Sequence, residues 1–90
     1  MKVLKFGAVW CSACLVMKPR WTKVEKEYPV FESEYFEYDD NPEKIKEYGI
    51  EEASLPVFIF LDKEGNELER ISGEISKKKL VELVNKYKDK

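Results

Sequence analysis

The stretch Trp10-Cys11-Ser12-Ala13-Cys14 decides how this chain is interpreted, because it places two cysteines one helical turn apart. An apolar run over residues 3–9 precedes the stretch, and a segment with helical periodicity over residues 15–28 follows it. We therefore expect the cysteines where a buried strand ends and a helix begins. The unpaired N–H groups and partial positive charge of a helix N-terminus favour a thiolate, so the pKa of Cys11 should lie below its ordinary value of about 8.5.

The spacing of the two cysteines also predicts a reversible disulfide. Cys14 follows Cys11 by three residues, which puts both side chains on one face of the helix. A disulfide usually joins Cα atoms that are about 4.4–6.8 Å apart, and one helical turn is compatible with this separation. The stretch is therefore interpreted as a dithiol that can open and close, in which Cys11 attacks and Cys14 resolves.

Length and composition limit the classes of protein that the chain can represent. Its 90 residues predict a single domain over residues 1–90, and 43% hydrophobic residues predict a folded core rather than disorder. The net charge is −2, with 16 basic and 18 acidic residues and no basic patch, which argues against nucleic-acid binding. No apolar run approaches the roughly 20 residues that span a membrane.

The start of the chain and its cysteine content bear on where the protein works. Residues 1–5, MKVLK, lack the apolar region of a signal peptide, so we expect a cytoplasmic protein. In a reducing compartment, a lone cysteine pair points to catalysis or metal binding more than to a structural cross-link. We also expect the protein to act as a monomer.

Hydrophobic periodicity and turn residues predict seven elements in the order β-α-β-α-β-β-α. The strands are expected over residues 3–9, 34–38, 55–61 and 67–71. The helices are expected over residues 11–28, from residue 42 to a stop at residue 49, and over residues 77–88. A helix joins the first two strands, which should make them parallel, and the last two strands should form a hairpin. The predicted fold class is α/β, with a four-stranded mixed sheet flanked by helices on both faces.

Local signals delimit the helices and assign their buried sides. Asn41 and Ser76 are expected to cap the second and third helices, and Gly49 followed by Ile50 is expected to end the second in a Schellman motif. Pro19 interrupts the first helix and should kink it. The residues assigned to the buried stripe of the first helix are Cys14, Met17, Trp21, Val24 and Tyr28. Those assigned to the buried face of the last helix are Leu80, Val81, Val84 and Tyr87.

Taken together, these motifs resemble the thioredoxin family over nearly the whole chain. Trp10-Cys11-x-x-Cys14 is similar to the redox motif of that family. Pro19, Pro56 and Gly73 are similar to its helix-kinking proline, its cis-proline and the glycine of its substrate groove. The usual N-terminal strand and helix of thioredoxins are missing. The resemblance is therefore to a minimal thioredoxin-like fold, closer in size to the glutaredoxins.

The resemblance implies an enzyme, a thiol–disulfide oxidoreductase that forms a mixed disulfide with its substrate. In that family the residues at the positions of Cys11 and Cys14 are the nucleophile and the resolving thiol. The residues implied in substrate binding are Trp10, Leu55, Pro56 and Gly73, with Pro56 in the cis form. The resemblance also implies that no bound cofactor is needed. The expected partners are disulfide-containing protein substrates and either a thioredoxin reductase or a small thiol as electron donor.

Ser12, Ala13 and Lys5 depart from the family pattern and are expected to tune the chemistry. Ser12-Ala13 stands where thioredoxins usually carry Gly-Pro and glutaredoxins Pro-Tyr, and this dipeptide influences the redox potential. Lys5 stands where thioredoxins carry a buried aspartate that helps to deprotonate the resolving cysteine. A lysine inside a central strand needs a carboxylate partner or a path to the sheet edge. We expect Lys5 to pair with Glu37 on the neighbouring strand.

Three alternatives to this function remain open at the level of the sequence. The first is half of a zinc site, although structural zinc takes four ligands and the chain has two cysteines and no histidine. The second is a redox-inert interaction domain that uses the same fold only for binding. The third is a glutaredoxin-like reductase that depends on glutathione.

Overall fold

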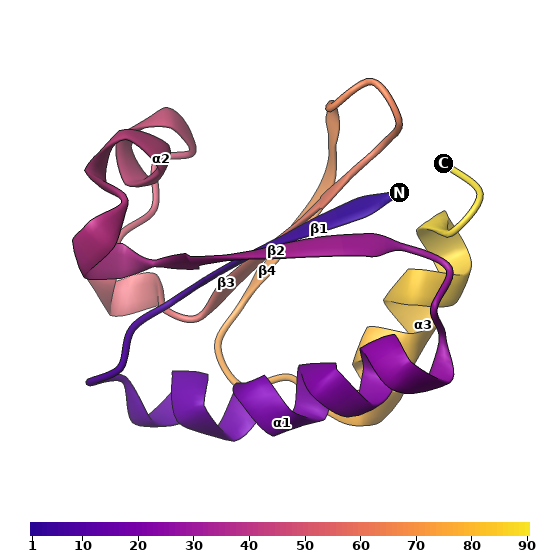
Figure 1. The fold of residues 1–90 in the computed structure, drawn as a ribbon, viewed down its shortest axis with the longest axis horizontal. Coiled ribbons are helices and arrows are strands. Elements are labelled where there is room, and N and C mark those ends of the chain that lie inside the picture. Colours follow the sequence, from indigo (N-terminus) through magenta and orange to yellow (C-terminus); the bar gives the residue numbers. More distant parts are fainter.

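The structure is a computed structural model that describes residues 1–90, and its element order agrees with the prediction (Figure 1). The strands are β1 (Lys2–Gly7), β2 (Glu32–Glu37), β3 (Val57–Leu61) and β4 (Glu67–Ser72). The helices are α1 (Ser12–Glu27), α2 (Pro42–Glu47) and α3 (Lys77–Tyr87). Two short 3-10 turns, η1 (Tyr38–Asp40) and η2 (Glu52–Ser54), lie on either side of α2. The predicted α/β class is confirmed.

Strand pairing produces the predicted four-stranded mixed sheet, in the order β2-β1-β3-β4. β1 runs parallel to β2 because α1 carries the chain back between them, and β1–β3 and β3–β4 are antiparallel pairs. β1 ends at Gly7 rather than at the predicted Val9. The reason is that β3 pairs with it only as far as Val57, which lies opposite Phe6, and Val9 is 72% exposed.

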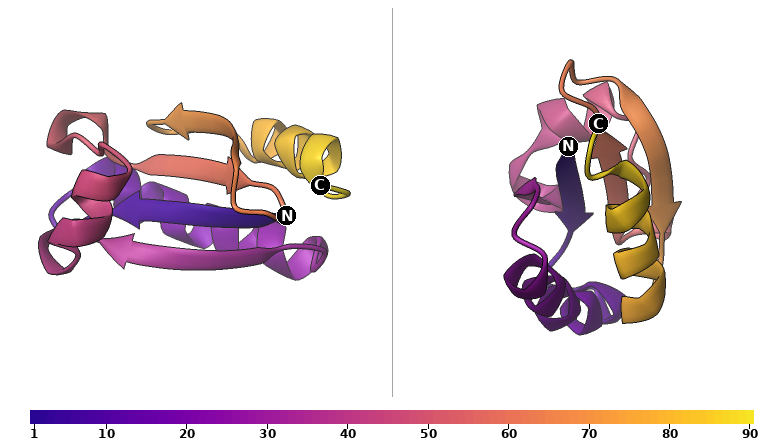
Figure 2. Two further views of the ribbon diagram at one scale, coloured as in Figure 1. Left: turned by 90° about the horizontal axis from the view of Figure 1, so that it is seen from above. Right: turned by 90° about the vertical axis from the view of Figure 1, so that its right-hand side faces the viewer.

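Helices cover both faces of the sheet, as predicted. α1 and α3 lie side by side on one face, and α2 lies near one end of the opposite face (Figures 1 and 2). The core between the sheet, α1 and α3 contains Val3, Met17, Trp21, Val24, Phe58, Phe60, Leu80, Leu83 and Val84. The core on the α2 face contains Leu4, Phe6, Ala8, Cys14, Phe36, Ile50, Leu55, Val57, Ile59 and Leu61. Alternate residues of the central strands therefore serve different cores.

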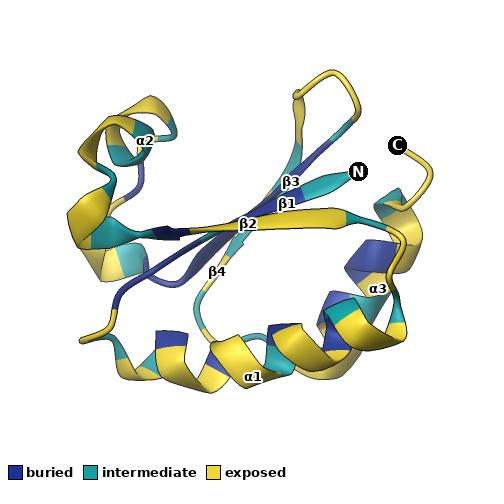
Figure 3. Ribbon diagram, in the orientation of Figure 1, coloured by how far each residue is buried: buried dark blue, intermediate teal, exposed yellow.

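β2 is an edge strand, and most of it is exposed (Figure 3). Only Phe36 is buried, on the α2 face. The opposite face of β2, which lies beside α1, carries Ser33, Tyr35 and Glu37. Apolar side chains would be expected on a strand face that packs against a helix. Tyr35 on this polar face lies near Gly7, which Cys14 also approaches.

The predicted helix ends are confirmed in position, and one of the two predicted caps lacks its side-chain hydrogen bond. α2 ends in a Schellman motif: the Ile50 N–H donates to the Ile45 carbonyl at 2.9 Å, and Gly49 has a φ of +61°. Ser76 caps α3 by accepting the Lys79 N–H at 3.2 Å. Asn41 occupies the predicted N-cap position of α2, but it lacks the side-chain capping hydrogen bond. The Asn41 side chain donates to the Glu37 carbonyl across η1 and makes no cap hydrogen bond to α2.

The buried faces of α1 and α3 agree with the prediction except at the margins. Pro19 lies inside α1, which continues on both sides of it. Leu83 is buried although it was not predicted, and Val81 and Tyr87 are only half-buried. α3 packs against α1 as well as against the sheet, so its buried face is displaced from the one expected for a helix on a sheet alone.

Ile59 provides a test of the α2-side core. It is fully buried at the centre of β3, so Ile59→Ala should lower the free energy of unfolding by about 2–5 kcal/mol in urea denaturation of the oxidised protein. Val30→Ala is the control at a 52% exposed position and should change it by less than about 0.5 kcal/mol. Equal losses in the two variants would contradict the assigned core.

Candidate active site

Cys11 and Cys14 form a disulfide across the first turn of α1, with Cα atoms 5.2 Å apart. α1 begins at Ser12, one residue later than predicted, and Cys11 is its N-cap. The Cys11 sulfur accepts the Cys14 N–H at 3.2 Å, and the Cys11 carbonyl accepts the Leu15 N–H at 3.1 Å. An N–H donor and the positive end of the helix dipole therefore favour a thiolate at Cys11 once the pair is reduced.

The two cysteines differ in their access to solvent. Cys11 is half-buried, whereas Cys14 is 8% exposed and packs into the α2-side core with Phe6 and Leu55. An external disulfide can reach the Cys11 sulfur first, and Cys14 can then act only within the protein. The predicted division into an attacking and a resolving thiol is consistent with this geometry.

Pro56 and Gly73 meet beside the cysteines. The Leu55–Pro56 bond is cis, as predicted, and Pro56 lines the same cavity as Cys14. The Pro56 carbonyl accepts the Gly73 N–H at 2.8 Å, and Gly73 has a φ of +87°, which favours glycine. The loop after Gly73 is anchored in turn, because the Ile75 N–H donates to the Met17 sulfur at 3.3 Å.

Leu55 has fewer free backbone hydrogen-bonding groups for a substrate segment than the sequence predicted. Its side chain is 8% exposed and belongs to the α2-side core. Its N–H donates to the Glu52 carbonyl at 3.3 Å within η2, a long hydrogen bond that a substrate would have to displace. Backbone pairing at Leu55 remains a prediction, and its carbonyl is the group more readily available for it.

Trp10 is held over the site by residues of η1. Its indole Nε1 donates to the Asp39 carboxylate at 2.8 Å, and its ring stands edge-on to Tyr38 with 6.1 Å between centroids. Trp10 is 49% exposed, so it combines a fixed orientation with an accessible apolar surface. Asp39 was not singled out from the sequence, since nothing in a run of two aspartates before a helix indicates an indole partner.

The residues between the cysteines are accessible to a substrate. Ser12 is exposed and Ala13 is half-buried in the first turn of α1. Other large apolar side chains beside them are also exposed, namely Val9, Leu15 and Val16. Together with Trp10, these exposed side chains lie close in the sequence to the two cysteines and are called the apolar rim; such exposed apolar groups are suited to contact with another protein.

The predicted Lys5–Glu37 pair is wrong. Lys5 does lie on the α1-facing side of β1, but its Nζ pairs with Glu25 of α1 at 3.0 Å. The side chains of the pair are 16% and 28% exposed, and Glu25 also accepts a hydrogen bond from Ser33. Glu37 has other partners: its carboxylate accepts the Val9 N–H at 2.9 Å and the Tyr35 hydroxyl at 2.8 Å.

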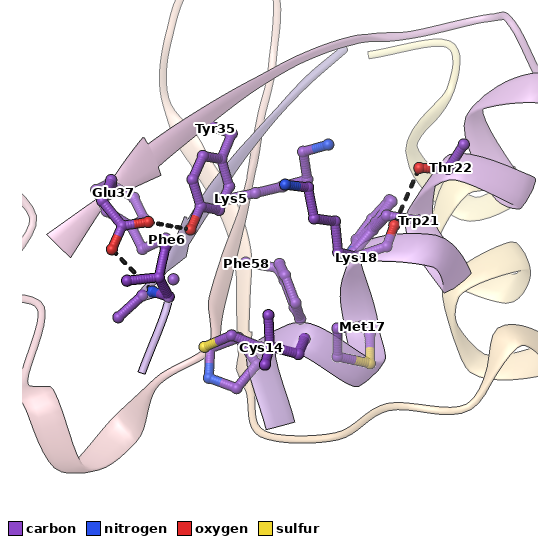
Figure 4. A pocket seen from close by; sticks show the side chains of 15 residues that line it. Lys5, Phe6, Cys14, Met17, Lys18, Trp21, Thr22, Tyr35, Glu37 and Phe58 are labelled. Atoms are coloured by element: carbon purple, nitrogen blue, oxygen red, sulfur yellow. Dashed lines mark hydrogen bonds between the residues drawn. The ribbon is translucent and has the colours of Figure 1, made fainter. Parts of the chain in front are cut away.

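A cavity of about 170 Å³ lies between the sheet and α1, directly beside Cys14. Its walls are mainly apolar, and its polar lining residues include Lys5, Lys18, Tyr35 and Glu37. Figure 4 shows Tyr35 and Glu37 hydrogen-bonded to each other at the wall of the cavity that Cys14 also lines. Burial and the hydrogen bond to Glu37 both raise the pKa of Tyr35 above its ordinary value, so its hydroxyl stays protonated at neutral pH.

The sequence did not indicate a role for Tyr35, because its strand has the charged composition that is typical of a sheet edge. The available signal was alternation: Ser33, Tyr35 and Glu37 share one face of β2, and the register places that face level with Lys5 and Gly7 of β1.

The described chain offers no group of three or more His, Cys, Asp or Glu side chains that could hold a metal ion. None of its helices combines the length and apolar character needed to cross a bilayer.

An accessible sulfur at a helix N-cap, joined to a buried sulfur one turn later, is the arrangement of thiol–disulfide oxidoreductases. The thioredoxin family model matches residues 1–86, and the chain belongs to the thioredoxin family. Thioredoxins are protein-disulfide oxidoreductases, and this chain keeps their Cys-x-x-Cys pair as Cys11 and Cys14. The oxidoreductase interpretation is confirmed at this level, and neither the glutathione-dependent nor the redox-inert alternative is favoured.

Curated relatives support this family membership. The chain is 35% identical over 86 residues to the chloroplastic thioredoxin-like protein HCF164 of Arabidopsis thaliana, covering 92% of this chain but only 32% of that protein. It is 31% identical over 85 residues to a thioredoxin of Chlamydia caviae, covering 94% of this chain and 80% of the relative. The chain thus spans about a third of the chloroplast protein and most of the bacterial one.

Solved structures agree with the sequence relatives. Thioredoxin-2, described as a component of malaria parasite protein secretion machinery, superposes with a TM-score of 0.88 at 29% identity, covering 96% of this chain and 82% of that chain. Thioredoxin NaTrxh of Nicotiana alata superposes with a TM-score of 0.85 at 28% identity, covering 96% and 71%. The predicted thioredoxin-like fold is confirmed.

A double-mutant cycle tests the partner assigned to Lys5. Lys5→Met and Glu25→Gln should show a coupling of about 1 kcal/mol in the free energy of unfolding, because the pair is partly screened by solvent. The same cycle with Glu37→Gln in place of Glu25→Gln is the control and should give a coupling near zero. A larger coupling to Glu37 would contradict the structure.

Proposed function

We propose that this protein reduces or exchanges disulfides in protein substrates through a two-step exchange. The Cys11 thiolate attacks one sulfur of the substrate disulfide and forms a mixed disulfide. Cys14 then attacks the Cys11 sulfur, and the substrate leaves as a dithiol while the Cys11–Cys14 disulfide forms. The single observation that carries this proposal is the asymmetry of the pair, with Cys11 accessible at the N-cap of α1 and Cys14 buried behind it.

The proposed substrate site surrounds the Cys11 sulfur. Trp10 supplies apolar surface on one side, and the Pro56–Gly73 contact forms the other. An extended substrate segment would lie along Leu55 and Pro56 and place its disulfide against Cys11. Recognition would then depend on shape and apolar contact at the rim more than on charge.

We further propose that the protein is a reductant, that it works as a monomer in the cytoplasm, and that it receives electrons from a thioredoxin reductase or a small thiol. Its similarity to proteins named thioredoxin supports the proposed direction of electron transfer, from this protein to its substrate. The lone cysteine pair supports the compartment, since such a pair can be recycled as a dithiol only where a reducing supply exists. No bound cofactor is required, because the electron pair moves between sulfur atoms.

Trapping the mixed disulfide tests the roles of the two cysteines. Cys14→Ser should accumulate a covalent, reductant-sensitive adduct with a disulfide-containing test protein such as insulin, because nothing displaces the substrate from Cys11. Cys11→Ser is the matched variant and should form no adduct and reduce insulin at the background rate. Non-reducing electrophoresis and intact-mass measurement report both results. An adduct that formed equally well in Cys11→Ser would contradict the assignment.

The reduction potential tests the direction. Equilibration in graded thiol–disulfide buffers, followed by tryptophan fluorescence, should give a value within about 30 mV of the −270 mV of thioredoxin. A value near the roughly −120 mV of a strong oxidant would make the protein an oxidase instead. Ala13→Pro is a useful comparison, since it changes the Ser12-Ala13 dipeptide and leaves both cysteines in place.

A further inference from the structure

Gly7 lies where the polar face of β2 meets the resolving cysteine. A Cβ at this position would lie 3.1 Å from the Tyr35 hydroxyl oxygen and 3.4 Å from the Cys14 Cβ. The absence of a side chain at Gly7 therefore leaves room for the Tyr35 hydroxyl and Cys14 beside one small space. That space belongs to the 170 Å³ cavity beside Cys14, which has room for a bridging water.

The Tyr35 hydroxyl is hydrogen-bonded to the carboxylate of Glu37, which is also bonded to the backbone before the cysteines. It donates to one oxygen of the Glu37 carboxylate at 2.8 Å, and the Val9 N–H donates to the other oxygen at 2.9 Å. The two contacts hold the carboxylate in place beside the redox loop. Glu37 is only half-buried, so its carboxylate is accessible to solvent.

Resolution of the mixed disulfide requires a group that accepts the proton of the Cys14 thiol. Cys14 is buried, its thiol must lose a proton before it can attack, and burial in apolar surroundings disfavours the thiolate. Both neighbouring lysines have other partners. Lys5 is paired with Glu25, and Lys18 lies over the Tyr35 ring at 6.0 Å.

We propose that Tyr35 and Glu37 take the proton from Cys14 while it resolves the mixed disulfide. This inference rests on the exchange reaction proposed above and adds to it the acceptor of the second step. The S–H proton passes to the Tyr35 oxygen, directly or through one water, as the Tyr35 hydroxyl proton passes to the Glu37 carboxylate. The Cys14 thiolate then attacks the Cys11 sulfur, and the bond between Cys11 and the substrate breaks.

The step is balanced in protons and electrons. The departing substrate sulfur takes the electron pair of the broken bond as a thiolate and is protonated by solvent, while Glu37 releases its proton to solvent. The Cys11–Cys14 pair is oxidised by two electrons and the substrate disulfide is reduced by two. Tyr35 ends the step as it began, with its proton. The other titratable groups around the cavity are Lys5 and Glu25, which neutralise each other, and Lys18.

Stopped-flow reaction of the reduced protein with 5,5′-dithiobis(2-nitrobenzoate) separates the two steps. The first equivalent of nitrothiobenzoate reports attack by Cys11 and its rate depends on reagent concentration. The second reports resolution by Cys14 and its rate does not. Glu37→Gln and Tyr35→Phe should each slow the second phase about tenfold or more at neutral pH and leave the first within about twofold. Glutamine at position 37 can still accept the Val9 N–H, so the loop is preserved.

The pH profile provides a readout that a structural role would not change. In Glu37→Gln the second phase should rise in proportion to hydroxide, because solvent must remove the proton, whereas in the unmodified protein it should level off near neutral pH. The double variant should be no slower than Glu37→Gln alone, because the two groups act in series. Glu34→Gln is the matched control: it removes a carboxylate from the same strand, on the opposite face, where Glu34 pairs with Lys2.

Three results would overturn the inference. They are an unchanged second phase in both variants, an equal slowing of both phases, and an equal effect of Glu34→Gln. Failure of the exchange reaction itself would look different, since the first phase would then be absent in the unmodified protein.

Discussion

The hydrogen bond from the Cys14 N–H to the Cys11 sulfur joins the redox pair to the start of α1, and the site depends on where that helix begins. β1 ends at Gly7 in the middle of the sheet, and the chain turns directly into α1. The turn leaves Cys11 outside the helix, as its cap, and Cys14 inside it, against the core. The difference between the two thiols therefore comes from one local backbone feature placed at the end of a central strand.

Strand register brings the other site residues to the same end of the sheet. Phe6, near the end of β1, lies opposite Val57, and Val57 lies opposite Ser72 at the end of β4. The residues next to this row are the redox loop, Pro56 and Gly73. Residues far apart in the sequence thus form one surface because three strands pair in a fixed register, and the central strands are held in that register by burial on both faces.

A polar layer lies under α1, along the exposed edge of the same sheet. Lys5 bonds to Glu25, and Tyr35 bonds to Glu37, so each charged or hydroxyl group is satisfied by a neighbour. A buried thiol can lose its proton readily only when an acceptor is close, and this layer places one beside Cys14. The polar face of β2 is thus tied to the chemistry of the site rather than to stability alone.

The order of the elements, the position of the cysteines at a strand-to-helix junction, the cap at Ser76 and the helix stop at Gly49 can be predicted from the sequence alone, because each depends on residues only a few positions apart. The cis form of Pro56 was reached through resemblance to a family and not through spacing. The pairing of Lys5 with Glu25 instead of Glu37, and the presence of both the Tyr35 hydroxyl and the Cys14 Cβ beside Gly7, depend on the three-dimensional arrangement of the elements. Several carboxylates lie within reach of any long side chain, and the choice among them follows from packing in three dimensions, which local sequence patterns do not specify.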